Sequence, residues 1–110
     1  MKIHTRDEND VKIVSFEGEL DTSTSPEAEA HLDELRASGI QKILLDFEKL
    51  DFISSAGLRV LLATAQQLSS TGGEMKLCNL NETVQEVFDI SGFSVLLMVF
   101  DSEAEAMSGF

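Results

Sequence analysis

The order of secondary-structure signals in the second half of the chain restricts its fold more than any other feature. Short apolar runs suited to strands alternate with longer runs suited to helices, three times in succession. Such alternation predicts parallel strands joined by right-handed crossovers, with helices packed on the sheet. The predicted elements are a strand at Ile43–Leu45, a helix over residues 55–69, a strand at Met75–Leu80, a helix from Asn81 to Gly92, a strand at Val95–Phe100 and a last short helix.

Local signals support several of these elements. The run Ile43–Leu45 is apolar without alternation, which is typical of a strand buried on both faces of a parallel sheet. Residues 55–69 are apolar over most of the helix circumference, so this helix should be well buried. Asn81 is a good N-cap for the following helix. Ser102 and Glu105 form a capping-box pattern that predicts the start of the last helix.

The first part of the chain predicts an antiparallel hairpin and one helix. Lys2–Thr5 reads as a short edge strand, Arg6–Asp10 as a polar turn and the stretch Val11–Phe16 as a second strand. The segment Gly18–Asp21 then reads as a loop. A serine followed by proline at Ser25–Pro26 predicts a helix with a hydroxyl N-cap and proline in its first turn. The fold class is therefore α/β, with a mixed sheet that joins this hairpin to the parallel part.

Length and charge narrow the classes of protein. A chain of 110 residues fits one domain, so we expect a single domain over residues 1–110. It carries 20 acidic and 8 basic residues, a net charge of −12, which disfavours binding to nucleic acid or to an anionic membrane. The acidity favours a basic partner surface, or it serves only solubility. A lone cysteine, no apolar leader and no long apolar run predict a cytoplasmic location.

The stretch Asp51–Leu58 is the most informative for function. It lies where the first parallel strand leads into the buried helix, and open α/β sheets commonly bind ligands beyond the carboxyl ends of their strands. The free N–H groups of a helix N-terminus also favour an anion. A phosphoryl group on Ser54 or Ser55 would therefore be accommodated there. The alternative is that one serine is simply the helix N-cap.

These motifs, taken in order, resemble the STAS domain family, and within it the stand-alone bacterial anti-sigma factor antagonists. The resemblance covers nearly the whole chain and implies a STAS-like fold. It rests on the segments Gly18–Asp21, Leu45–Ile53, Ser54–Leu58, Gly72–Met75 and Phe88–Phe93.

The resemblance also implies a switch. In the family, an anti-sigma factor that is also a serine kinase phosphorylates the first serine of the motif, which is Ser55 here. The unphosphorylated antagonist binds this kinase and frees the sigma factor, and a phosphatase removes the phosphoryl group. Asp21, Ser54, Ser55, Ala56 and Gly57 are then the partner-binding residues. Two positions depart from the family pattern, since Ser54 replaces an aspartate and Ala56 a second hydroxyl residue, so Ser54 is the alternative acceptor.

Other chemistry has less support in the sequence. The histidines His4 and His31 have no neighbouring ligands at metal-site spacing. A serine hydrolase would require His31 to reach Ser55. No phosphate-binding glycine loop is present, and Cys78 in an apolar strand is expected to be a buried small side chain. We therefore expect no catalytic residue, no metal, no cofactor and no enzyme activity.

Two alternative functions remain open at this point. One is a STAS component of another kinase-controlled partner-switching pathway. The other is a STAS module that binds a small ligand or a nucleotide.

Overall fold

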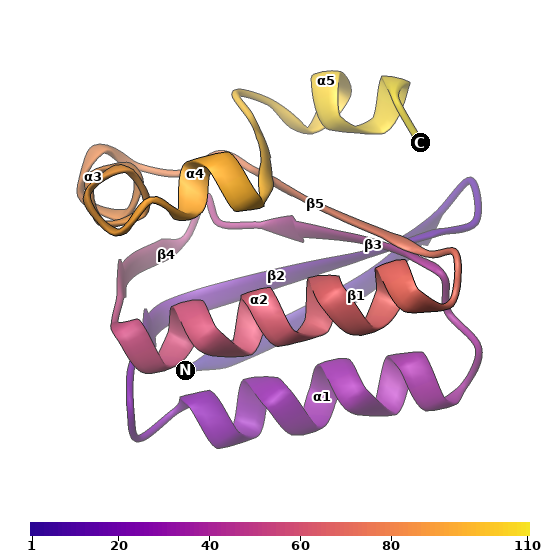
Figure 1. Ribbon diagram of the computed structural model, residues 1–110, viewed down its shortest axis with the longest axis horizontal. Helices are drawn as coiled ribbons and strands as arrows, with labels where there is room; N and C mark the ends of the chain where they lie inside the picture. The colour runs from indigo at the N-terminus through magenta and orange to yellow at the C-terminus, as the bar shows by residue number, and fades with distance from the viewer.

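The computed structural model describes residues 1–110, which form a six-stranded mixed sheet with helices on both faces (Figure 1). The strands lie in the order β1-β2-β3-β5-β6, and β4 pairs with the end of β2. Strands β1 and β2 are antiparallel, whereas all other pairs are parallel, so the predicted mixed sheet is confirmed. The elements are β1 Lys2–Glu8, β2 Val11–Leu20, α1 Ser25–Ala37, β3 Lys42–Asp46, β4 Leu50–Ile53, α2 Ser55–Ser70, β5 Glu74–Cys78, α3 Glu82–Ser91, α4 Phe93–Leu96, β6 Met98–Phe100 and α5 Glu103–Ser108.

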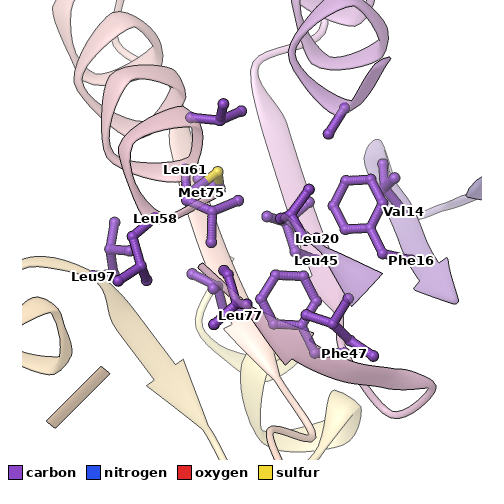
Figure 2. Close-up of a cluster of buried hydrophobic side chains, with 14 of the residues drawn as sticks. Val14, Phe16, Leu20, Leu45, Phe47, Leu58, Leu61, Met75, Leu77 and Leu97 are labelled. Atoms are coloured by element: carbon purple, nitrogen blue, oxygen red, sulfur yellow. The ribbon is translucent and has the colours of Figure 1, made fainter. Parts of the chain in front are cut away.

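The main core lies between one face of the sheet and the helices α1 and α2, which lie side by side on that face (Figure 1). Figure 2 shows part of this core, to which α2 contributes Leu58 and Leu61 and β5 contributes Leu77. The rings of Phe16 and Phe47 pack with their centroids 5.9 Å apart. Helix α2 is buried on its sheet-facing side, but Arg59, Gln66 and Ser70 are exposed, so the predicted burial over most of the helix circumference holds for one side only. None of the helices is long and apolar enough to cross a bilayer.

A second, smaller core lies under α5 on the opposite face of the sheet. Val11 and Ile13 of β2 point into it, whereas Val14 and Phe16 point into the main core. The strand therefore buries side chains on both faces, which explains why its sequence alternates imperfectly. As predicted, Cys78 is a buried side chain, and it belongs to this second core.

A buried lysine attaches α5 to the sheet. Lys76 of β5 is only 2% exposed, and its Nζ donates a hydrogen bond to the carbonyl oxygen of Ala106 at 3.1 Å. The same ammonium lies 4.4 Å from the centroid of the Phe110 ring and 5.1 Å from that of Phe100. Contacts of this kind stabilise a cation that has lost part of its hydration.

The predicted strand Val95–Phe100 is wrong in its first half. Gly92 adopts φ +80°, which ends α3, and the next residues form the short helix α4. Only Met98–Phe100 pair with β5. As a result, Val95 and Leu96 are exposed instead of buried.

Two boundaries in the first part of the chain also differ from prediction. The hairpin turn is only Asn9–Asp10, and both residues have positive φ, 50° and 66°. Two-residue turns of this kind match the twist of paired strands, so β1 continues to Glu8. The predicted loop at Gly18–Asp21 is mostly strand, because β2 runs on to Leu20 and pairs there with the unpredicted strand β4.

The packing of α2 leads to a stability prediction. Leu61 is fully buried in the main core, whereas its neighbour Leu62 is only half-buried. We expect Leu61→Ala to lower the free energy of unfolding by about 2–5 kcal/mol, because it removes buried methyl groups and leaves a cavity. Leu62→Ala should be clearly milder. Urea unfolding of both variants measures the difference, and an equal or larger loss at Leu62 would contradict this orientation of α2.

Candidate functional site

The candidate site is the N-terminus of α2, where two adjacent serines differ in their bonding. Ser54 is the N-cap, with extended backbone, and its Oγ accepts a hydrogen bond from the backbone N–H of Gly57 at 3.3 Å. Ser55 is the first helical residue. Its side chain is exposed, and its hydroxyl makes no hydrogen bond within the chain. The site thus presents one serine engaged in capping and one that is free.

The end of β2 fixes the position of this helix terminus. The backbone N–H of Ser54 donates to the carbonyl oxygen of Leu20 at 2.9 Å. A Cβ on the buried Gly57 would lie 2.9 Å from the side chains of Leu20 and Ile53 and from the Leu20 carbonyl oxygen. Real Cβ atoms essentially never approach so closely, so only glycine allows this seating of the helix.

Asp21 follows Leu20 directly and organises the start of α1. Its Oδ1 accepts hydrogen bonds from the Ser23 hydroxyl and from the backbone N–H groups of Ser23 and Thr24, at 2.8–3.1 Å. These bonds, first that of the Ser23 hydroxyl, lower the pKa of the Asp21 carboxyl. The prediction of Ser25 as N-cap is wrong, because Thr24 occupies that position and the Ser25 hydroxyl donates to the Asp21 carbonyl oxygen.

Within α2 itself, the charges near Ser55 suit an anion better than the net charge of the chain suggests. The first turn of α2 holds no acidic residue. Arg59 lies one helical turn after Ser55, is exposed and forms no ion pair. Residues four apart share a helix face, so this guanidinium is within reach of a group attached to Ser55. Arg59 was not among the residues predicted from the sequence, although its spacing from Ser55 is the signal that points to it.

On the neighbouring β4, Asp51 and Phe52 are exposed, and Phe52 keeps 40% of its surface accessible. Ala56 is half-buried behind Ser55. Of the predicted partner-binding residues, Ser55 therefore offers an exposed side chain, and the bonds of Asp21 and Ser54 hold the local backbone in place.

Three other side chains with reactive groups, His31, Asp46 and Cys78, lie elsewhere or are engaged otherwise. His31 Nε2 lies 2.8 Å from the Thr5 hydroxyl on β1, so the structure does not bring His31 to Ser55. The carboxylate of Asp46 accepts a hydrogen bond from the Asn79 amide at 3.2 Å. Burial, together with the nearby Asp46 charge, raises the pKa of the Cys78 thiol to about 12, which keeps it protonated.

Comparison with known proteins places the whole chain in one group. The model of the STAS domain family matches residues 2–106. A protein of Bordetella bronchiseptica, described as the candidate anti-sigma factor antagonist BtrV, is 40% identical over 98 residues, which are 89% of this chain and 84% of that protein. An anti-sigma F factor antagonist of Paenibacillus polymyxa is 31% identical over 109 residues, 98% of this chain and 93% of the relative.

Solved structures agree with this grouping. The crystal structure of a candidate anti-sigma factor antagonist from Thermotoga maritima superposes with a TM-score of 0.92 at 26% identity, covering 97% of this chain and 92% of the other. The structure of the Bacillus cell fate determinant SpoIIAA in its phosphorylated form gives a TM-score of 0.73 at 25% identity and covers 97% of both chains.

The two serines should respond differently to removal of their hydroxyls. Ser54→Ala deletes the cap and should lower the free energy of unfolding by about 0.5–2 kcal/mol. Ser55→Ala deletes a hydroxyl without a partner and should change it by less than about 0.5 kcal/mol. Urea unfolding of the two variants, which differ only in the position of the same substitution, measures both values. The assignment of cap and free serine fails if Ser55→Ala is the more destabilising change.

Asp21 leads to a prediction about pH. Because its pKa is lower in the folded chain, its carboxylate contributes stability that is complete above its unfolded pKa and is lost as the pH falls through the folded pKa. Acidification from about pH 5 to about pH 2 should therefore destabilise the native chain more than Asp21→Asn, which does not titrate. Urea midpoints measured across this range test the difference, and identical pH profiles would refute the role of these hydrogen bonds.

Proposed function

Because the chain belongs to the STAS domain family, we propose that it is a bacterial anti-sigma factor antagonist. In this role it binds an anti-sigma factor in the cytoplasm and so frees a sigma factor. The descriptions of the relatives from Bordetella and Paenibacillus support the proposal, since both align with most of this chain and at least 84% of their own length. On this view the chain acts as one domain that regulates by binding, not as an enzyme.

We further propose that phosphorylation of Ser55 by an anti-sigma factor with serine kinase activity turns the antagonist off, and that a phosphatase turns it on again. The observation that carries this proposal is the difference between the two serines. The Ser55 hydroxyl is exposed and unbonded, so a kinase can reach it, whereas the Ser54 hydroxyl holds the helix cap. The phosphorylated form of SpoIIAA, a structural relative, is consistent with a switch of this type.

The fold should tolerate a phosphoryl group on Ser55. The added charge is roughly −1.5 to −2 at pH 7 and would lie at the positive end of the α2 dipole. Arg59, one turn along the helix and free of other ion pairs, is placed to neutralise part of it. The modification should therefore leave the folded state nearly unchanged.

The effect should fall on the complex instead. A surface of the anti-sigma factor shaped for the Ser55 hydroxyl would have to accommodate or desolvate a dianion, which is unfavourable. A loss of about 2–3 kcal/mol at the interface weakens binding roughly 30- to 150-fold, which is enough to release a partner. The switch thus requires no rearrangement of the antagonist.

Phosphorylation and binding test this proposal together. The chain is incubated with its cognate kinase and ATP, and the phosphorylated residue is located by mass spectrometry. We expect label on Ser55 in the native chain and in Ser54→Ala, and none in Ser55→Ala. Label on Ser54 alone would overturn the site assignment, and no label on either serine would overturn the phosphorylation switch.

Binding to the kinase is then measured by calorimetry. Ser55→Asp should bind at least about tenfold more weakly than the native chain while keeping its circular-dichroism spectrum. Ser70→Asp, the same substitution at the far end of the same helix, is the matched control and should bind normally. Equal binding by all three proteins would refute Ser55 as part of the interface.

A further inference from the structure

We propose that the surface formed by the end of α2, by α4 and by β6 is an interface between two copies of this chain. We call it the neutral surface, and define it by Val95 and by the groove-lining residues of the segments 65–73 and 94–98. It is separate from the Ser55 site and would form whether or not the chain has the function proposed above.

The neutral surface differs from the rest of the chain because it carries almost no charged residues. The chain as a whole is 25% charged and carries a net charge of −12. Two of its segments, Val60–Gly73 and Ile90–Phe100, contain no charged residue at all. The fold brings these segments together, because both line a groove of about 350 Å³ in which Glu74 is the only charged residue.

The same surface exposes apolar side chains. Val95 is 88% exposed, Leu96 is 61% exposed and Met98 is 43% exposed. Leu96 and Met98 line the groove on one side, and Ala65 and Ser69 of α2 line it on the other. Exposed apolar side chains that gather around a groove are unfavourable in water and are typical of interaction sites.

Shape and charge together favour a second copy as the occupant. Helix α4 has no buried residue and lies directly beside the groove, so a two-fold axis could place Val95 and Leu96 of each copy in the groove of the other. Two chains of charge −12 repel each other, and contact through uncharged surfaces avoids placing carboxylates face to face. Strand β6 also forms an edge of the sheet, which leaves backbone groups available to a partner.

The neutral surface and the Ser55 site lie at opposite ends of α2. The helix has 16 residues, so its two ends are roughly 22 Å apart at 1.5 Å per residue. A second copy on the neutral surface would therefore leave Ser55 accessible. Self-association and binding of the anti-sigma factor should be independent events.

Sedimentation equilibrium on the purified chain tests the proposal. We expect a monomer–dimer equilibrium that tightens when NaCl is raised from about 0.05 M to about 0.5 M, because salt screens the repulsion between acidic copies. Val95→Glu places a charge at the centre of the contact and should weaken the dimer at least about tenfold. Gln67→Glu, which adds the same charge at an exposed position outside the groove lining, should leave it within about twofold.

Three results would overturn the proposal. The chain could remain monomeric at both salt concentrations up to about 1 mM. A dimer could form with the same affinity in Val95→Glu as in Gln67→Glu, which would place the contact elsewhere. A monomeric chain could instead bind another protein in a manner abolished by Val95→Glu, which would assign the surface to that partner. Ser55→Asp should dimerise normally. Failure of the dimer proposal is therefore distinguishable from failure of the phosphorylation switch.

Discussion

The close approach between the first turn of α2 and the end of β2 determines the positions on which the rest of the site depends. It requires a residue without a side chain at Gly57, and the backbone bond from Ser54 to Leu20 holds the contact. With this end fixed, the apolar face of α2 lies along the sheet and fills the main core. The exposed Ser55 and the ordered loop at Asp21 then flank the same contact, because Asp21 follows Leu20 directly.

The sequence predicted the parallel half of the fold well because its signals there are strong and local. Asn81 caps α3 and Ser102 caps α5, as their residue types indicated. The signal at Val95–Phe100 was ambiguous, since a short apolar run without charges fits a buried strand and a helix equally well. The positive φ of Gly92 decides that α4 begins there. Strand β4 was not predicted because it is only four residues long and half of it is exposed.

The residue types in the sequence located the candidate site at the start of α2, but they did not show which serine caps the helix and which is free. Two adjacent serines are equally good caps in sequence terms, and only the starting point of α2 separates the bonded Ser54 from the free Ser55. The resemblance to the STAS family already favoured Ser55. The sequence pattern could not predict the burial of Lys76. A lysine in a strand is normally exposed, and this one is buried only because α5 folds over it.

The position of the two proposed surfaces on one helix bears on how a switch here can work. A modification changes the affinity of a distant site only if it favours one of two conformations that differ at that site. Helix α2 is packed against the sheet by Leu58 near its start and by Leu68 near its end, both almost fully buried. A phosphoryl group on Ser55 fits the helix terminus as it stands, so it does not favour a second conformation of α2. Its influence should therefore be direct and local, confined to the partner that contacts Ser55, while the neutral surface stays unaffected.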